Sequence, residues 1–211
     1  MIQANYSDHS LLNPSTRPLL IVLSGPSGAG KDAVLAKVKE SGYPIKHITT
    51  ATTRPRRPGE RDDVDYHFVS PEAFREMIEN KQLLEWAEVY DNMYGVPRQP
   101  VKLALDSGQD VIVKVDIQGA ANIKKLLPQA VLIFLTPPSA EDLNLRLKHR
   151  RTEAAPDLNL RLKTAGEEIK QLPICDYVVV NRQDEIDMAA AQVASIIDAE
   201  KCRVHRREVS L

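Results

Sequence analysis

The first residues that could do chemistry form a glycine-rich run ending in a lysine: Gly25, Pro26, Ser27, Gly28, Ala29, Gly30 and Lys31. The run follows an apolar stretch and opens a helical pattern, which is the setting that a phosphate-binding loop requires. Its glycines let backbone N–H groups surround phosphate oxygens, and the helix N-terminus adds partial positive charge. We therefore expect nucleotide phosphates here, with Lys31 at the β- and γ-phosphates. A glycine-rich turn without function is the alternative.

The next residue departs from the usual pattern of such a loop. Asp32 stands where a Ser or Thr hydroxyl normally binds the Mg²⁺ that accompanies the nucleotide. A carboxylate is a hard oxygen donor of the kind that Mg²⁺ accepts. Asp32 is therefore a candidate metal ligand.

A second candidate site is a basic loop in which Arg54, Arg56 and Arg57 stand close together in sequence. Pro and Gly residues interrupt the loop, and Tyr66 follows with a phenolic hydroxyl. Arginine guanidinium groups can bind two oxygens of a phosphate dianion at once. The segment therefore indicates a second phosphate site, although runs of charge more often form a solvated surface.

The elements that must position these loops alternate between strands and helices. Continuous apolar runs, typical of strands buried on both faces, occur at 19–23, 111–115, 131–135 and 177–180. Helical patterns occur at 31–40, 118–126, 140–148, 158–171 and 185–201. The alternation predicts an α/β fold with a mostly parallel, doubly wound sheet. Ligand sites in such sheets lie beyond the carboxyl ends of the strands.

Two stretches interrupt this alternation and indicate insertions into the core. Residues 49–96 are rich in Arg, Tyr, Asp and Glu, with short strand-like pieces at 66–69 and 83–89, and residues 149–160 are polar. We therefore predict a division of the chain into a flexible N-terminal arm at 1–18, a phosphate-loop core at 19–48, 97–148 and 172–211, an α+β binding lobe at 49–96 and a small helical lid at 149–171.

Composition narrows the class of protein. The net charge of −1 gives no bulk attraction to nucleic acid or to an anionic membrane. No apolar run approaches the roughly 20 residues of a membrane span, and the polar N-terminus lacks the pattern of a signal peptide. The widely spaced Cys175 and Cys202 favour a reducing compartment, so we expect a cytoplasmic location. The basic C-terminus at 201–211 is interpreted as a solvated helix end, with a phosphate or partner contact as the alternative.

Together, the motifs resemble those of guanylate kinase over about residues 19–198. The resemblance rests on the phosphate loop, the segment 52–69, Glu85-Trp86-Ala87-Glu88, Tyr94-Gly95, Asp116-Ile117-Gln118-Gly119-Ala120, Arg146-Leu147, Arg150, Arg161-Leu162 and Val180-Asn181. Many nucleotide-hydrolysing proteins share the phosphate loop. The arginine segment combined with the Glu-Trp-Ala stretch is the more specific feature.

The resemblance implies transfer of the γ-phosphate of ATP to GMP, with Mg²⁺ as cofactor and dGMP as an alternative acceptor. The implied GMP-binding residues are Thr50, Arg54, Arg57, Tyr66, Glu85, Tyr94 and Asp116. Among them, Glu85 would accept hydrogen bonds from guanine N1–H and N2–H₂, and Thr50 would donate to O6.

The implied ATP-binding residues are the phosphate loop from Gly25 to Asp32, Arg146 and Asn181. The implied catalytic residues are Lys31, Arg150 and Arg161, which would surround the transferring phosphoryl group. Without the shared spacing, each of these residues also has an ordinary structural interpretation. We expect no nucleic-acid or membrane partner, and either a monomer or a homodimer.

Four residues depart from the family pattern. Asp32 replaces a hydroxyl, Lys114 replaces an acidic residue, Val96 replaces a Ser or Thr that assists guanine recognition, and Asp63 replaces a Gly. Glu85 and Thr50 are retained, so guanine remains the expected base.

Asp32 and Lys114 are interpreted as a coupled pair. Asp32 adds negative charge beside the phosphates, and Lys114 adds an ammonium to an apolar strand, where it would be costly without a partner. The strand of Lys114 commonly neighbours the strand that leads into a phosphate loop, which predicts an ion pair at the base of the loop. Direct ligation of Mg²⁺ by Asp32 and two unrelated substitutions are the alternatives.

Two other functions stay open from the sequence. One is a different kinase on the same scaffold, such as a ribose bisphosphate kinase. Some relatives of that kind carry Gly-Lys-Asp in the loop, but they are not expected to keep the arginine segment with Glu85. The other is a non-catalytic guanylate-kinase-like module that binds phosphopeptides, which usually lacks the intact phosphate loop.

Overall fold

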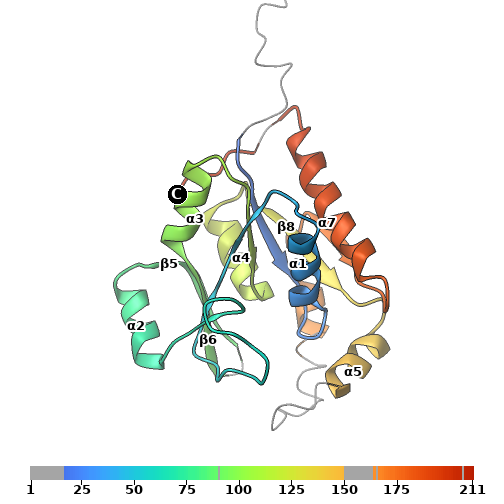
Figure 1. The fold of residues 1–211 in the computed structure, drawn as a ribbon, viewed down its shortest axis with the longest axis horizontal. Helices are drawn as coiled ribbons and strands as arrows, with labels where there is room; N and C mark the ends of the chain where they lie inside the picture. The colour runs from blue at the N-terminus through green and yellow to red at the C-terminus, as the bar shows by residue number, and fades with distance from the viewer. Residues whose placement is uncertain (1–16, 90, 150–163, 165, 206) are drawn as a thin grey trace, which may run out of the picture.

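The computed structural model describes residues 17–89, 91–149, 164, 166–205 and 207–211. The predicted N-terminal arm, with the exception of its last two residues, lies outside the described residues. Most of the predicted lid also lies outside them, together with Arg150 and Arg161. The described residues form two sheets with their associated helices (Figure 1).

The core is a five-stranded sheet in which every strand runs parallel to its neighbours, in the order β2-β7-β1-β8-β9. Its strands are β1 (Leu20–Ser24), β2 (Lys46–Ile48), β7 (Val111–Lys114), β8 (Val131–Thr136) and β9 (Tyr177–Val180). All residues of the central strand β1 are buried, as expected in a sheet covered on both faces. The predicted α/β fold with a mostly parallel, doubly wound sheet is confirmed.

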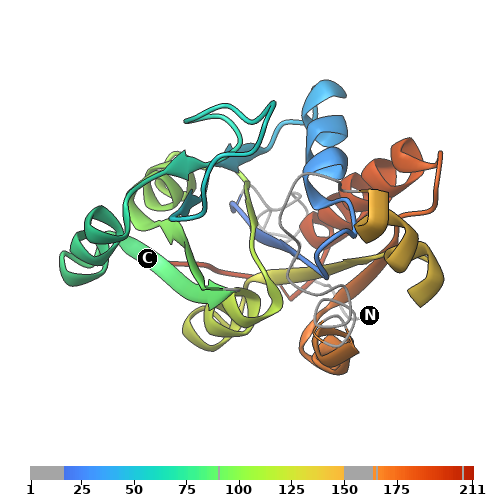
Figure 2. The same cartoon turned by 90° about the horizontal axis from the view of Figure 1, so that it is seen from below.

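Helices cover both faces of this sheet. The helices α3 (Arg98–Asp106) and α4 (Ile117–Leu126) pack on the face that carries Leu20 and Val22. The helices α1 (Lys31–Glu40) and α7 (Ile186–Lys201) pack on the opposite face, with Ile21 and Leu23 (Figure 2). Successive residues of a strand point to opposite faces, so the one apolar run of β1 contributes to two hydrophobic cores.

The second sheet is inserted between β2 and α3 and has the strand order β4-β3-β6-β5. Its strands are β3 (Ala51–Thr52), β4 (His67–Phe68), β5 (Leu83–Val89) and β6 (Asn92–Pro97). The helix α2 (Pro71–Glu79) packs on it through the fully buried Phe74. The predicted helices do not include α2, although Ser70 followed by Pro71 is a helix-start signal. The Ser70 hydroxyl accepts a hydrogen bond from the Ala73 backbone N–H.

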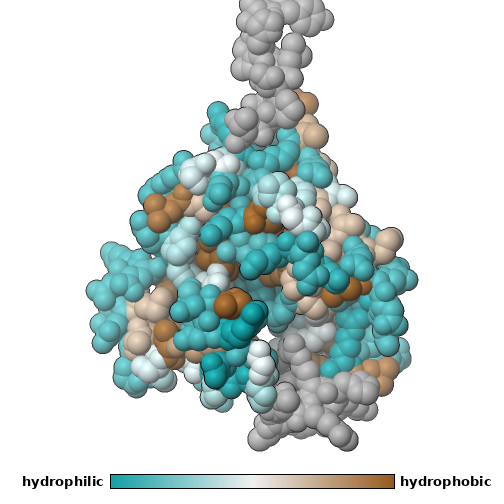
Figure 3. Space-filling view, viewed as in Figure 1, coloured by the Kyte–Doolittle hydropathy of each residue, from teal (hydrophilic) through white to brown (hydrophobic). Residues whose placement is uncertain are grey.

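Further described helices are α5 (Ala140–His149) and the short η2 (Leu172–Ile174), and residues 166–170 are also helical. In the described part of the chain, no helix combines the length and the apolar character needed to cross a bilayer. Hydrophilic residues cover most of the face shown in Figure 3, and its hydrophobic residues are scattered among them.

The C-terminal segment agrees only in part with the prediction of a solvated helix end: residues 202–205 after α7 are exposed, but residues 207–211 lie against the protein. After α7, the segment runs back to α3, where Lys102 Nζ donates a hydrogen bond to the Leu211 backbone oxygen at 3.0 Å (Figure 1). Val209 and Leu211 pack against the core. The apolar residues at the very end of the chain therefore hold the basic segment against the protein.

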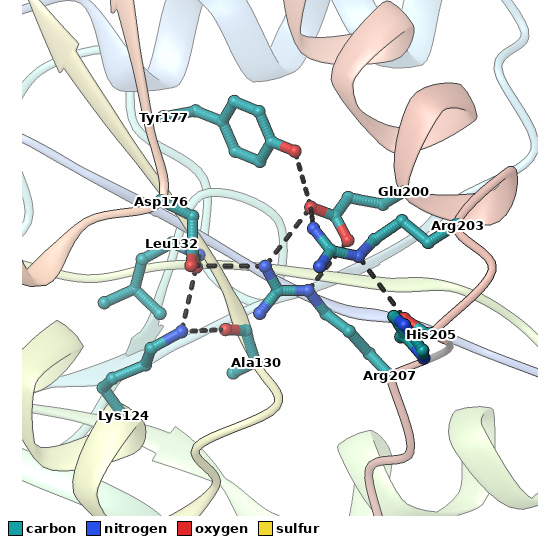
Figure 4. Close-up of polar contacts among 9 residues, drawn as sticks. All are labelled: Lys124, Ala130, Leu132, Asp176, Tyr177, Glu200, Arg203, His205 and Arg207. Carbon is teal, nitrogen blue, oxygen red and sulfur yellow. Dashed lines mark hydrogen bonds and ion pairs between the residues drawn. The ribbon is translucent and has the colours of Figure 1, made fainter.

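An ion-pair network secures the same segment. Arg207 contacts Glu200 at 2.8 Å and Asp176 at 3.2 Å, and Lys124 contacts Asp176 at 2.9 Å (Figure 4). The Glu200 side chain is fully buried and also accepts a hydrogen bond from the Tyr177 hydroxyl at 2.6 Å. A buried carboxylate needs such partners, so the basic residues of the tail neutralise acidic groups of the core.

Candidate active site

A cleft of about 470 Å³ is lined by residues of the core and by residues of the inserted sheet. Most residues predicted to bind nucleotides line it: Gly25, Ser27, Gly28, Gly30, Lys31, Asp32, Thr50, Arg54, Arg57, Tyr66, Glu85, Tyr94 and Asp116. The loops after β1 and β7 both contribute to this lining. The structure therefore brings together two motifs that are far apart in the sequence.

The glycines of the phosphate loop are required by its backbone. Gly25 has φ 136° and Gly30 has φ 93°, which lie in the region that favours glycine. A Cβ atom at Gly25 would lie 2.0 Å from the Leu135 backbone oxygen, and one at Gly30 would lie 2.4 Å from Asn181 Nδ2. The loop can therefore pass close to its neighbours only with glycine at these positions.

Lys31 begins α1 and lies across the phosphate loop. Its ammonium donates hydrogen bonds to the backbone oxygens of Gly25 (2.5 Å) and Pro26 (3.1 Å). Burial lowers the pKa of Lys31, while the nearby carboxylates of Glu168 and Asp32 oppose that shift. The cation is thus held at the place where a phosphate would meet the loop amides.

Arg146 and Asn181 contact the phosphate loop outside the cleft lining. Asn181 Nδ2 donates to the Ala29 backbone oxygen at 2.8 Å, and Arg146 donates to the same oxygen at 3.3 Å. Arg146 also donates to the Asn181 backbone oxygen at 2.7 Å. Pro26 and Ala29 likewise do not line the cleft. Direct contact of Arg146 or Asn181 with ATP stays a prediction.

Glu60 orders the arginine segment. Arg54 donates from one terminal nitrogen to both Glu60 oxygens, at 2.8 and 3.0 Å. The Arg57 backbone N–H donates to Glu60 Oε2 at 2.8 Å. Burial opposes ionisation, but these bonds outweigh it and lower the pKa of Glu60. Glu60 is not among the residues predicted from the sequence, although an acid close to two arginines within one motif is a detectable signal.

Two tyrosines complete this end of the cleft. The rings of Tyr66 and Tyr94 lie edge to face with centroids 6.2 Å apart. The Arg54 guanidinium carbon lies 5.5 Å from the Tyr66 ring centroid. Burial raises the pKa of Tyr94, which keeps its hydroxyl protonated as a hydrogen-bond donor. With Arg54 and Arg57, the two tyrosines offer several donors to one anion.

Glu85 of β5 brings a buried carboxyl group to the cleft. Its Oε2 is buried and makes no hydrogen bond with any described residue. Burial, followed by the negative charge of Asp116, raises the pKa of Glu85 to about 8. A buried polar atom without a partner is costly. The carboxyl group is therefore suited to bind a ligand that supplies hydrogen-bond donors.

Asp116 caps the helix that packs against Glu85. Its Oδ1 accepts hydrogen bonds from the backbone N–H groups of Gln118 (2.7 Å) and Gly119 (3.0 Å), which fixes the start of α4. Asp116 also lines the cleft. The capped first turn places Gly119 beside the Glu85 carboxyl group. Asp116 thus supports the pocket through the helix backbone.

The predicted ion pair between Lys114 and Asp32 is confirmed. β7 lies beside β1, with Lys114 opposite Leu23, and Lys114 Nζ contacts Asp32 Oδ1. Burial would lower the pKa of Lys114, but Tyr66 and Asp32 outweigh it and raise that pKa, so the ammonium stays charged. The assignment of Asp32 as a metal ligand stays a prediction.

Glu168 also lines the cleft, and the sequence reasoning did not identify it. Burial raises its pKa to about 7, against the opposing charge of Lys31. It belongs to the predicted helix at 158–171, of which the structure describes 164 and 166–171. A single acid within a helical pattern carries no sequence signal that separates it from a solvated residue.

The chain matches a known protein family over most of its length. The sequence model of the guanylate kinase family matches residues 16–200. The chain belongs to the guanylate kinase family. It is 48% identical over 189 residues to the guanylate kinase of Desulfitobacterium hafniense strain Y51, covering 90% of this chain and 94% of that protein.

Two further relatives agree with this membership. The chain is 46% identical over 201 residues to guanylate kinase 2, chloroplastic/mitochondrial, of Oryza sativa subsp. japonica, covering 95% of this chain and 70% of the relative. The solved guanylate kinase of Anaplasma phagocytophilum superposes with a TM-score of 0.73 at 31% identity, covering 93% of this chain and 92% of that one.

Two departures of this family member have a structural explanation. Asp63 has φ 61°, in the left-handed region where glycine is favoured, which accounts for the usual Gly at that position. Val96 lies opposite Glu85 in the β5–β6 pair, but its side chain is fully buried in the core and is not part of the cleft lining. Its apolar side chain therefore fits the place that it occupies.

Proposed function

We propose that this guanylate kinase family member transfers the γ-phosphate of ATP to GMP, giving ADP and GDP. The observation that carries the proposal is that one cleft joins the phosphate loop, the arginine segment and the buried carboxyl group of Glu85. A nucleoside monophosphate kinase needs these three together, because donor phosphate, acceptor phosphate and acceptor base must be held in one geometry.

Glu85 would select guanine over adenine. Its carboxylate can accept hydrogen bonds from guanine N1–H and N2–H₂, whereas adenine has no donor at either position. Thr50 is also buried and lines the cleft, where its hydroxyl would donate to guanine O6. A mismatched base would leave buried polar groups unpaired, at a cost of about 1–3 kcal/mol each. dGMP carries the same base and is expected to serve as a second acceptor.

The two phosphate sites would supply positioning and positive charge. Lys31 and the loop amides would hold the donor phosphates, and Arg54 and Arg57 would hold the phosphate of GMP. Phosphoryl transfer needs mainly in-line placement and charge on the equatorial oxygens. The second pKa of a phosphate monoester is about 6, so the acceptor oxygen is already ionised near neutral pH. Arg150 and Arg161, outside the described residues, are proposed to close over the reacting group.

The donor atoms of the cleft fit a Mg²⁺ ion that arrives with ATP. At nucleotide sites, Mg²⁺ typically uses one or two carboxylates together with phosphates and water. Asp32 lines the cleft and would hold the ion, and Asp116, which lines the same cleft, is proposed to support GMP binding. The described residues contain no cluster of three or more His, Cys, Asp or Glu that could hold a metal by itself. Bound Mg²⁺ would neutralise phosphate charge.

A coupled assay of ADP formation tests this proposal. ATP is supplied with GMP, dGMP, AMP, UMP or ribose 1,5-bisphosphate. We expect strong turnover of GMP and weak turnover of AMP and UMP. Preference for ribose 1,5-bisphosphate would favour the alternative sugar kinase, and GMP binding without ATP binding would favour a non-catalytic module. Equal rates with GMP and AMP would contradict the role of Glu85.

We also propose a cytoplasmic location and a monomeric or homodimeric state, with ATP and GMP as the ligands of the cleft. Sedimentation of the purified protein would measure the oligomeric state, and fractionation of cells would measure the location.

A further inference from the structure

Lys114 is a buried cation in the cleft that the proposed reaction does not yet use. It is the last residue of β7, and its side chain is only 10% exposed. Its neighbours in the cleft lining include Lys31 of the phosphate loop and Arg54 of the inserted lobe. A cation at this place lies among the groups that would hold both phosphates.

Two contacts hold the Lys114 ammonium between the core and the lobe. On the core side it pairs with Asp32, which follows Lys31 in α1. On the lobe side it lies 3.9 Å from the centroid of the Tyr66 ring. Arg54 packs on the same Tyr66 ring. The ammonium is therefore placed between the donor-phosphate loop and the acceptor-phosphate arginines.

Neutralisation of the Asp32 charge does not by itself explain why the Lys114 ammonium is buried here. The Asp32 side chain is 59% exposed, so water can solvate its carboxylate without help from an ammonium. An ion pair with such an exposed partner is usually weak. Desolvation of Lys114, by contrast, is costly, and apolar residues of similar volume often replace buried ion pairs without loss of stability. A buried ammonium at this place therefore fits a ligand of opposite charge.

We propose that Lys114 is a phosphate-binding residue of this site, whose ammonium exchanges Asp32 for phosphate oxygens when the two nucleotides bind. This inference rests on the proposed function, because it takes the cleft to bind a donor and an acceptor phosphate. The exchange is favourable because a polyphosphate carries more negative charge than one carboxylate. It leaves Asp32 beside the loop, where it remains a candidate Mg²⁺ ligand.

Calorimetry with a bisubstrate probe tests the inference without turnover. The probe is adenosine joined to guanosine through five phosphates, and it is titrated in buffer containing EDTA. Lys114→Met should weaken its binding roughly ten- to hundred-fold, the range for losing a hydrogen bond to a charged group. Lys114→Arg keeps the positive charge and should bind the probe more tightly than Lys114→Met. Lys37→Met removes the same charge near the far end of α1 and should change little.

The Asp32→Asn variant distinguishes two possible roles of Lys114, which are binding of phosphate and neutralisation of the Asp32 charge. If Lys114 binds phosphate, Asp32→Asn should bind the probe at least as tightly as the unaltered protein. The double variant Asp32→Asn, Lys114→Met should then stay as weak as Lys114→Met. If Lys114 only neutralises Asp32, the double variant recovers full affinity, and that recovery would overturn the inference.

The remaining outcomes are also decisive. Unchanged probe affinity in Lys114→Met would overturn the inference and leave the proposed function intact. Failure of the unaltered protein to bind the probe would overturn the inference, whereas the proposed function is tested separately by the assay of ADP formation. Near-ultraviolet circular dichroism of each variant shows whether it is folded, and Lys114→Gln, which also removes the charge, provides a second variant if Lys114→Met is not.

Discussion

A methyl group on Gly119 would lie 2.7 Å from Oε1 of Glu85, so the first turn of α4 and the carboxyl group of β5 can coexist only because residue 119 has no side chain. Gly119→Ala should therefore displace the Glu85 carboxyl group. We expect GMP affinity to fall roughly tenfold or more, the scale for losing a hydrogen bond to a charged group. ATP affinity should be unchanged.

Calorimetric titration with each nucleotide measures this effect. Alanine is favoured over glycine within a helix by about 0.5–1 kcal/mol, so the free energy of unfolding should not fall greatly. Equal GMP affinity in Gly119→Ala and the unaltered protein would show that the carboxyl group need not occupy this position.

Binding of GMP should release a proton at neutral pH. The pKa of Glu85 is raised to about 8, chiefly by burial, so the group is mostly protonated at pH 7. Guanine N1–H and N2–H₂ require the carboxylate form of Glu85 as acceptor, so most of one proton must leave when GMP binds at pH 7. Affinity should rise between pH 7 and 8 and level off above the pKa. Titration calorimetry in buffers of different ionisation enthalpy measures the released proton.

Glu85→Gln provides the matched test of that linkage. The variant should bind GMP more weakly and release much less of the proton. Glu88→Gln on the same strand has an exposed side chain and should behave as the unaltered protein. Proton release that persists undiminished in Glu85→Gln would assign it to another group.

Glu60 should affect GMP binding through Arg54 rather than by touching the nucleotide. Glu60→Gln removes the charge that holds Arg54 and the Arg57 backbone in place. We expect the KM for GMP to rise roughly tenfold, the scale of a lost charge-assisted hydrogen bond, with the ATP affinity unchanged. Arg54→Ala should impair GMP use at least as strongly.

Steady-state kinetics, with ATP and GMP varied in turn, measure the effect of the substitution on each substrate separately. Glu72→Gln, an exposed acid in the same lobe, is the control. A loss of ATP affinity in Glu60→Gln that matched the loss for GMP would mean that the segment serves the donor site instead.

Arg207→Met should destabilise the protein without changing nucleotide affinity. It deprives the fully buried Glu200 side chain of the closer and more buried of its two arginine partners. Removal of one partner from a buried ion pair costs about 3–5 kcal/mol. Arg203 also pairs with Glu200, but its side chain is 47% exposed, so Arg203→Met should cost less than about 1 kcal/mol. Urea unfolding of both variants gives the comparison.

The contribution of Arg207 should also depend on pH in a defined direction. Burial opposes ionisation of Glu200, but hydrogen bonds from Arg207 and Tyr177 outweigh it and lower the pKa of Glu200. In the unfolded protein the pKa of a glutamate is about 4.3, and in the folded protein the pKa of Glu200 lies below that value. Ionised Glu200 therefore stabilises the fold above about pH 4.3, and this stabilisation is lost as the pH falls through the lower pKa of the folded state. The difference between Arg207→Met and the unaltered protein should therefore shrink in acid. A difference that grew in acid would contradict this assignment.

The phosphate loop and the arginine segment could be recognised from the sequence because each is a local feature. The loop needs contiguous glycines, a lysine and a helix start, and a preceding apolar run supplies the strand. The buried strand β1 was predictable for the same reason, since burial on both faces leaves a continuous apolar run.

Contacts between distant parts of the chain depended on the tertiary structure. Gly119 meets Glu85 only because Asp116 fixes the start of α4 against β5, and no local pattern encodes that register. The sequence did not predict that the end of the tail packs against the protein. Arg207 contacts Asp176 and Glu200, and these two acids come together only in the fold. Lys114 and Asp32 could be proposed as partners from charge alone. Their pairing across 82 residues required β7 to lie beside β1, which strand packing decides.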